Sequence, residues 1–207
     1  MSNYAILSEH VVNGNEAGVV SEVNAALANN ASPLEIINSG LLAGMDVVSE
    51  QFANGDMFVP EVLMSAKAMY AGMDIVKPLL GEGDIASQGT VVIGTVKGDL
   101  HDIGKNLVVM MMESSGFKVI NLGTDTKKED FVKAAKEHNA DIVAMSAMLT
   151  TTMAYMDEII KACQEAGISA KYMIGGAPVT PAYAEKIGAV YTADAAAAAD
   201  RAKILAG

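Results

Sequence analysis

The apolar residues in the N-terminal part of the chain recur at the spacing expected of helices. Four segments show this pattern, 3–12, 15–29, 32–52 and 59–80, with almost no strand-like alternation between them. In the third and fourth segments, the apolar side chains form a stripe along one helix face. The pattern therefore predicts four helices packed as a small bundle. The stripe positions are Leu34, Ile37, Leu41, Met45, Val48 and Phe52, then Val62, Ala66, Met69, Met73 and Val76.

Local sequence signals predict where the third helix begins and where the helical domain ends. Ser32 can cap that helix, Pro33 suits its first turn, and Glu35 would complete a capping box. Farther along, the polar and glycine-rich stretch 81–89 has the composition of a linker. The sequence thus predicts a helical domain at 1–83, a linker at 84–89 and a second domain at 90–207.

The hydrophobic pattern changes after the linker, where short β-branched or apolar runs alternate with amphipathic segments. Such alternation predicts an α/β domain with a doubly wound parallel sheet and helices on both faces. The binding crevice of such a sheet lies at the carboxyl ends of its strands. The expected strands are 90–96, 117–123, 141–148 and 171–176, and the expected helices are 103–115, 127–138, 152–166 and 180–187.

Polar or glycine-rich stretches follow three of these expected strands. The first strand runs into "KGDLHDIGKN", residues 97–106, which places a histidine between two acids. The third ends in residues 146–150, "SAMLT", and the fourth in the pair Gly175 and Gly176. Because the carboxyl ends of parallel strands share one edge of the sheet, we expect these three stretches to surround a ligand.

Composition narrows the possible partners and the possible metal sites. The chain has 207 residues, half of them apolar, and a formal net charge of −11 with scattered Lys and Arg, so neither nucleic acid nor an anionic membrane is an expected partner. Cys163 is the single cysteine, which excludes an internal disulfide and a cysteine-based zinc or iron–sulfur site. No apolar window reaches the ~18 residues of a membrane span. The sequence predicts a cytoplasmic protein.

His101 is the candidate metal ligand in the loop 97–106. The other two histidines, His10 and His138, lie in distant predicted helices, and three separated histidines do not make a zinc site. A protein that supplies one imidazole needs a cofactor that supplies the remaining ligands, as a tetrapyrrole-like macrocycle does. Asp99 can accept a hydrogen bond from the other ring nitrogen and so fix the tautomer. A solvated surface loop is the alternative interpretation of the Asp-x-His triplet.

Phosphate binding is a second use that this glycine-containing loop suggests. The spacing from Gly98 to Gly104 and Lys105 is one residue longer than in a P-loop, and Asn106 stands where Ser or Thr is needed. Two acids would also face the phosphates. The Gly-x-Gly-x-x-Gly fingerprint of dinucleotide-binding folds is absent. These departures disfavour a phosphate site.

The ordered motifs resemble those of one family, the cobalamin-binding domains of the methionine synthase type, and in particular the small corrinoid proteins of methyltransferase systems. The family pattern Asp-x-His-x-x-Gly, Ser-x-Leu and Gly-Gly is matched by 99–104, 146–148 and 175–176, with Met148 in place of the Leu. That exchange nearly conserves volume. Residues 40–69, "GLLAGMDVVSEQFANGDMFVPEVLMSAKAM", resemble the helical cap of the family. The resemblance implies a Rossmann-like, flavodoxin-like cobalamin domain preceded by a four-helix cap.

The resemblance also implies roles for individual residues. His101 would replace the cofactor's own benzimidazole as the lower axial cobalt ligand, Asp99 would hydrogen-bond His101, and Thr152 would complete the relay where the family often has Ser. The displaced nucleotide tail would run beside the sheet, where a side chain at either glycine of the pair 175–176 would block it. Asp102 would favour the start of the following helix. The remaining implied cofactor-binding residues are Gly98, Leu100, Asp102, Ile103, Gly104, Ser146, Met148, Thr150, Gly175 and Gly176.

In the cap, Phe52, Val59 and Val62 match apolar positions that cover the reactive upper face of the corrin in the family. The alternative is that all three are ordinary core residues of the bundle. The two interpretations are compatible, because a residue of the bundle core can also cover the corrin. Residues 191–194, "YTAD", lie near the end of the domain and are expected to close the edge of the cofactor.

The function implied by the resemblance is that of a methyl carrier. A substrate-specific methyltransferase would methylate the bound cobalt, and a second methyltransferase would pass the methyl group to tetrahydrofolate or a thiol coenzyme; a reductive activase is a further expected partner. The methyl donor, whether a methylamine, a betaine, methanol or an aryl methyl ether, is left open. Two alternatives are the cobalamin subunit of a radical mutase, which lacks such a cap, and a cobalamin-dependent sensor, which usually carries a DNA-binding module.

Overall fold

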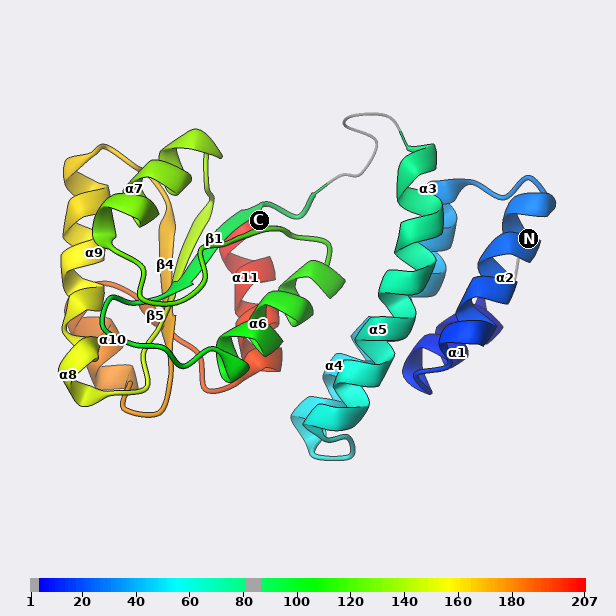
Figure 1. The fold of residues 1–207 in the computed structure, drawn as a ribbon, viewed down its shortest axis with the longest axis horizontal. Helices are drawn as coiled ribbons and strands as arrows, with labels where there is room; N and C mark the ends of the chain where they lie inside the picture. The colour runs from blue at the N-terminus through cyan, green and yellow to red at the C-terminus, as the bar shows by residue number, and fades with distance from the viewer. Residues whose placement is uncertain (1–3, 81–86) are drawn as a thin grey trace. The chain divides into compact units, whose positions relative to one another are not determined.

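The chain divides into two compact units, Met1–Ala86 and Ser87–Gly207. The structure is a computed structural model that describes residues 4–80 and 87–207. Figure 1 shows the helical unit in blue to green and the sheet-containing unit in green to red. Within the predicted linker 84–89, positions 84–86 lie outside the described residues, as does position 3 of the first predicted helix.

The N-terminal unit contains the helices that the hydrophobic pattern predicts. The third predicted helix is interrupted by a π-helical turn, Ile37–Leu42, which was not predicted. The adjacent residues Ile36 and Ile37, at the start of this turn, are both buried. The elements are α1 (Ala5–Val12), α2 (Glu16–Ala28), α3 (Pro33–Ile36), the π turn, α4 (Ala43–Asn54), α5 (Val59–Val76) and a short 3-10 turn, Lys77–Leu79.

Helix α1 packs closely against the segment that contains the π turn and α4. A Cβ atom at Gly40 would collide with the Leu7 side chain, and one at Gly44 would lie 2.7 Å from the Cβ of Val11. Leu7 and Val11 are both buried. The two glycines therefore allow the backbones to approach each other at a distance that larger residues would prevent.

The helix starts differ in part from the predicted ones. Ser32 stands at the N-cap of α3 but its side chain makes no capping hydrogen bond, so the predicted capping box with Glu35 is not formed. Glu35 instead accepts a hydrogen bond from the Tyr4 hydroxyl at 3.4 Å. The reciprocal bond expected of a capping box occurs at α5, where Glu61 accepts the Phe58 N–H at 2.8 Å.

The C-terminal unit is built on a five-stranded sheet in the order β2-β1-β3-β4-β5, and every pair of neighbouring strands is parallel. Four strands fall where the apolar runs predict them. The fifth strand and the helix after it were not predicted, because β5 has two residues and α11 is mostly alanine. The strands are β1 (Thr90–Thr95), β2 (Lys118–Asn121), β3 (Ile142–Ser146), β4 (Lys171–Gly175) and β5 (Val190–Tyr191).

Helices cover both faces of this sheet, as the alternating pattern predicts (Figure 1). One face packs against α7, α9 and α10, with Phe131, Ile159 and Ala184 in the core, and the other against α6 and α11, with Met112 and Ala198. The central strands are buried on both sides, which explains their continuous apolar runs. The helices are α6 (Ile103–Ser114), α7 (Lys128–Glu137), α8 (Thr150–Met153), α9 (Tyr155–Glu165), α10 (Pro181–Ile187) and α11 (Ala195–Ala206).

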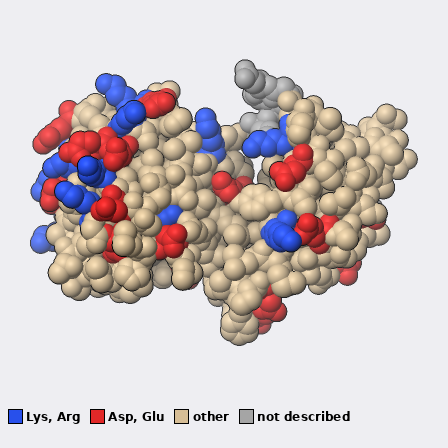
Figure 2. Space-filling view, in the orientation of Figure 1, with Lys and Arg blue, Asp and Glu red and all other residues tan. Residues whose placement is uncertain are grey.

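Charged side chains of both signs are mixed on the molecular face in Figure 2, most densely over α7 and α9. Lys128 of α7 and Glu158 of α9 form an ion pair at 3.2 Å. In the part of the chain that the structure describes, no helix combines the length and the apolarity needed to cross a membrane.

Candidate functional site

The loops that follow β1 and β3 lie side by side at the carboxyl edge of the sheet. Thr95 of β1 is paired with Ser146 of β3, and the Val96 N–H donates to the Ser146 carbonyl at 3.0 Å. In the strand order β2-β1-β3-β4-β5, the chain leaves β1 for β2 on one side, whereas it leaves β3 for β4 on the other side. Ligands of doubly wound sheets bind at this position.

The two loops meet at Asp99, which is completely buried. Its Oδ1 accepts hydrogen bonds from the His101 N–H at 3.1 Å and contacts His101 Nδ1 at 2.7 Å. Its Oδ2 accepts the Met148 N–H at 2.7 Å and the Thr152 hydroxyl at 2.9 Å. The predicted contacts of Asp99 with His101 and Thr152 are therefore present.

These hydrogen bonds decide the charge of Asp99. Burial by itself raises the pKa of the carboxyl group, but the hydrogen bonds from Met148, His101 and Thr152 outweigh it and lower the pKa from 3.8 to about 2. Asp99 is thus an anion at neutral pH and can only accept hydrogen bonds. The Nδ1 of His101 must then be the donor, which leaves the lone pair of a neutral ring on Nε2.

The His101 ring is presented at the surface, with 56 % of its side chain exposed. Apolar side chains on the same two loops are also exposed, namely Leu100, Ile103, Met148 and Leu149. A Cβ atom at Gly104 would meet no atom within 4 Å. A nitrogen ligand surrounded by open, apolar surface is suited to a broad, flat ligand that carries a metal.

The residues predicted to line the path of a nucleotide tail end up at the same edge. Ser146 and Gly175 are half-buried at the ends of β3 and β4, and Thr150 is exposed at the start of α8. Gly176 has a φ of +123°, and a Cβ there would collide with the Ala147 carbonyl oxygen. Packing between the two loops therefore requires this glycine whether or not a ligand is bound.

A buried lysine next to the site was not predicted to take part in it. Lys105, in the first turn of α6, donates to Asn106 Oδ1 at 2.6 Å and to Asn121 Oδ1 at 2.8 Å. Asn106 in turn donates to Asp102 Oδ2 at 3.0 Å. Burial lowers the pKa of Lys105, and the charge of Asp102 opposes this effect. The network joins the start of α6 to the end of β2.

Two other residues hold the loop 97–102 and were also missed. The buried Thr95 hydroxyl donates to the His101 carbonyl at 2.8 Å, and Asp125 Oδ1 accepts the Gly98 N–H at 2.7 Å. A hydroxyl inside a buried apolar strand is a recognisable signal for Thr95. Nothing in the local sequence singles out Asp125, because its contact depends on the order of the strands.

Two acids with predicted roles lie at helix starts. Asp102 is the N-cap residue of α6, but its side chain makes no capping bond and is held by Asn106 instead. Asp194 caps α11 by accepting the Ala197 N–H at 2.8 Å. Within 191–194, Thr192 is buried and Ala193 is exposed. The predicted role of this stretch at the edge of a cofactor stays a prediction.

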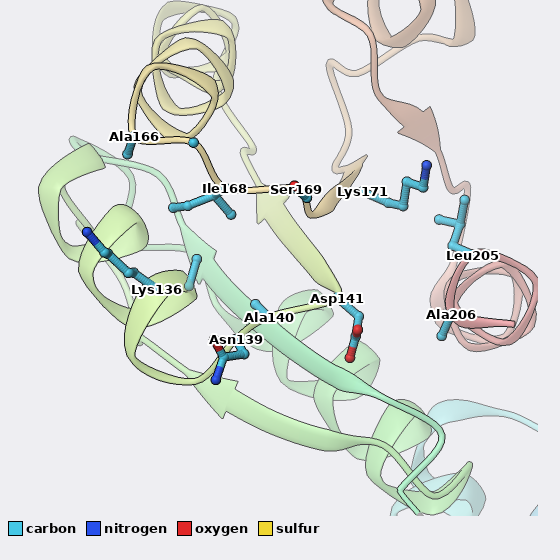
Figure 3. A pocket seen from close by; sticks show the side chains of 12 residues that line it. Lys136, Asn139, Ala140, Asp141, Ala166, Ile168, Ser169, Lys171, Leu205 and Ala206 are labelled. Atoms are coloured by element: carbon cyan, nitrogen blue, oxygen red, sulfur yellow. The ribbon is translucent and has the colours of Figure 1, made fainter.

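A hollow of about 450 Å³ lies at the opposite, amino edge of the sheet (Figure 3). Its lining includes Lys136, Asn139, Asp141 and Lys171, at the ends of α7 and the starts of β3 and β4. None of the predicted site residues lines it. The hollow and the Asp99–His101 pair are therefore separate features.

Comparisons with known proteins assign the chain to a family. A B12 binding domain family matches residues 89–202, more than half of the chain, and a second B12 binding domain family matches residues 5–77. The chain belongs to the B12-binding proteins. This confirms the resemblance seen in the sequence, the fold class and the corrinoid cofactor.

Individual relatives of this corrinoid protein cover most of its length. It is 48% identical over 168 residues to trimethylamine corrinoid protein 1 of Methanosarcina acetivorans, covering 79% of this chain and 78% of the relative. It is 46% identical over 177 residues to dimethylamine corrinoid protein 1 of the same organism, covering 84% and 83%. Its fold matches a chain in the methanol:cobalamin methyltransferase complex MtaBC of Methanosarcina barkeri, with a TM-score of 0.91, 32% identity, and 99% and 80% coverage.

The residues of this corrinoid protein fit a cobalt corrin at the carboxyl edge. His101 offers Nε2 to a metal, because Asp99 accepts the hydrogen bond from Nδ1. Exposed Leu100 and Ile103 flank the histidine on either side in the sequence and offer apolar surface to a macrocycle. The donor set thus suits a metal whose other ligands come from the cofactor itself.

The predicted cap residues of the corrinoid protein lie in the helical unit. Phe52 and Val59 are half-buried, and Val62 is completely buried. The predicted role of these side chains over the upper face of the corrin stays a prediction.

Proposed function

We propose that this chain is a methyl carrier that binds its corrinoid with the benzimidazole displaced and His101 as the lower axial ligand. It would receive a methyl group from a substrate-specific methyltransferase and deliver it to a second methyltransferase. The observation that carries the proposal is the buried Asp99 anion bound to His101 Nδ1, with the ring exposed at the carboxyl edge.

The bound corrinoid supplies a cobalt atom that accepts and releases the methyl group. The protein must supply a ligand that can leave the metal and return to it. When His101 Nε2 is not bound to the metal, the Asp99 carboxylate still accepts the hydrogen bond from Nδ1 and so keeps the imidazole in the same orientation. Thr152 and Met148 hold that carboxylate in place through both steps.

Apolar residues would shield the reactive metal from water. Leu100, Ile103 and Met148 would border the corrin on the side of the sheet, whereas Phe52, Val59 and Val62 are the proposed cover of its other face. Shielding favours methyl transfer to a partner enzyme over side reactions with solvent. Such a cover must also move to admit each partner.

The names of similar proteins support the proposed methyltransferase partners. Two of the similar relatives are named trimethylamine and dimethylamine corrinoid proteins, and one similar solved structure is a methanol:cobalamin methyltransferase complex. A methylamine or methanol methyltransferase is therefore the proposed donor enzyme. An acceptor-side methyltransferase, using tetrahydrofolate or a thiol coenzyme, and a reductive activase are the other proposed partners, and the cytoplasm is the proposed location.

Methyl transfer in a reconstituted system tests this function. The protein is loaded with cobalamin, reduced and mixed with methylamine or methanol methyltransferases and their substrates, and formation of methylcobalamin is followed by its visible spectrum. We expect transfer with at least one of these enzymes. His101→Ala should remove the histidine-ligated spectrum and impair transfer, because it removes the proposed cobalt ligand.

His138→Ala is the matched control, since His138 ends α7 and lies outside the site. It should leave both readouts as in the wild type. Binding of adenosylcobalamin without any methyl transfer would contradict the proposal and favour a mutase subunit or a sensor. An unchanged spectrum and rate in His101→Ala would refute the assignment of the ligand.

A further inference from the structure

Asp125 has an unusual backbone conformation for an exposed residue next to the site. It lies in the loop between β2 and α7, and its φ of +52° is in the left-handed region. That conformation is unfavourable for an L-residue other than glycine, and Asp and Asn tolerate it best because their side chains form local hydrogen bonds. Such a conformation persists where the surrounding contacts hold it.

The contacts of Asp125 reach across to the loop that carries the metal ligand. Its Oδ1 accepts the Gly98 N–H at 2.7 Å, and its own N–H donates to the Asp99 carbonyl at 3.0 Å. One residue therefore holds the backbone on both sides of the Asp99 Cα. The left-handed conformation allows the N–H and the side chain of Asp125 to serve the same short segment.

Asp125 is itself fixed by the sheet. The next residue, Thr126, is buried, pairs with Val96 in a parallel bridge and donates its N–H to the Thr95 carbonyl at 3.0 Å. Thr95 in turn donates its hydroxyl to the His101 carbonyl. The loop after β2 thus continues the pairing with β1 beyond the end of the regular strand and places Asp125 rigidly beside Gly98.

The loops after the two strands that flank β1 therefore hold different parts of Asp99. The loop after β3 binds its carboxylate through Met148 and Thr152, whereas the loop after β2 binds its backbone through Asp125. Since the Asp99 carboxylate directs His101 Nδ1, a shift of the Asp99 backbone would change the direction of the imidazole.

We propose that Asp125 is a positioning residue that fixes the backbone of Asp99 and thereby aims His101 Nε2 at the metal. The inference rests on the proposed function in that His101 is the cobalt ligand. The hydrogen bonds of Asp125 go to the Gly98 N–H and to the Asp99 carbonyl, which belong to the backbone of the loop. It acts by accepting one hydrogen bond and donating another.

Two substitutions separate the side chain of Asp125 from its backbone conformation. Asp125→Asn retains an acceptor oxygen and tolerates a positive φ, whereas Asp125→Gly permits the positive φ but removes the acceptor. Asn139→Gly is the matched control, because Asn139 is also exposed, has a φ of +48°, and lines the hollow at the opposite edge.

Two readouts are made on the full chain. The first is the visible spectrum of the cobalamin-loaded protein, which gives the fraction with histidine on cobalt. The second is amide hydrogen exchange of His101 in the cobalamin-free protein, because this N–H donates to Asp99 Oδ1 and reports whether the carboxylate is in place. Thermal unfolding of each variant monitors overall stability.

We expect Asp125→Gly to lower the ratio of histidine-ligated to unligated cobalamin about tenfold and to speed exchange of the His101 amide by a similar factor. Asp125→Asn should keep the ligation ratio and the exchange rate close to those of the wild type, and Asn139→Gly should change neither. A wild-type spectrum for Asp125→Gly, or equal losses in Asp125→Gly and Asp125→Asn, would overturn the proposal.

Failure of the proposed function would be visible separately. If the wild-type protein shows no histidine ligation, His101 is not the ligand, and the exchange measurement alone decides whether Asp125 positions Asp99. Faster exchange in Asp125→Gly but not in Asp125→Asn would then support positioning, whereas equal rates in all variants would refute it.

Discussion

Asp99 accepts hydrogen bonds from His101 close to it in the chain and from Met148 and Thr152 on the loop after β3. Both carboxylate oxygens face donors, so an anion fits this position better than any neutral side chain. The charge is consistent with a pKa lowered to about 2 in spite of burial. Few residues could replace Asp99 without leaving a buried donor unpaired.

Asp99→Asn tests the importance of this charge. The amide group can accept at one end only, so it must turn an N–H toward either His101 or the Met148 N–H and lose a bond there. We expect methyl transfer to slow by about 10–100-fold, less than in His101→Ala. Stopped-flow spectra of the loaded variant measure the rate, and a rate within about twofold of the wild type would show that the charge is dispensable.

Part of the site could be read from the sequence at this scale. Asp99 and His101 are two residues apart and follow a predicted strand, and family resemblance supplied Thr152. Asn121 and Asp125 could not be recognised, because Asn121 ends β2, Asp125 follows it, and both reach the site only through the pairing of β2 with β1. Sequence alone does not give that pairing.

At the scale of elements, the apolar runs located β1 to β4 because these strands are buried on both faces or pack on one. β5 is too short to make a run, and the alanines of α11 give no contrast between its faces. The π turn after α3 was missed because it changes the phase of the helix without changing its composition. The capping-box pattern at Ser32 was misleading, since its side chain makes no cap.

A buried thiol on helix α9 is expected to make the stability of the protein depend on pH. Cys163 is completely buried on α9, and burial raises the pKa of its thiol from 9.0 to about 11. The unfolded chain therefore loses this proton at lower pH than the folded protein. The contribution to stability is complete below about pH 9 and is lost as the pH rises toward 11.

Between about pH 8 and pH 11, the free energy of unfolding should fall by about 2 kcal/mol more in the wild type than in Cys163→Ala. Urea unfolding of the two proteins at matched pH values measures this difference, since the variant retains all other titrating groups. Parallel stability curves for the two proteins would mean that the thiol does not carry the effect.

At the scale of the whole molecule, two units match two B12 binding domain families along one chain. The change of hydrophobic period near residue 85 already indicated two parts, and three ordered motifs indicated the cofactor. The three motifs follow β1, β3 and β4, which are neighbours in the sheet, so the motifs lie next to one another at its carboxyl edge. The first and second motifs meet where the loops after β1 and β3 lie side by side, and the third follows β4, the next strand in the sheet.

Electron paramagnetic resonance of the Co(II) form reveals whether His101 is the lower cobalt ligand. The protein is labelled uniformly with ¹⁵N and loaded with unlabelled cobalamin. A ligand nitrogen of spin one-half splits the cobalt signal into doublets, whereas the ¹⁴N of benzimidazole gives triplets. We predict doublets in the wild type and their absence in His101→Ala. Triplets in the labelled wild-type protein would show that benzimidazole remains on cobalt and that His101 is not the ligand.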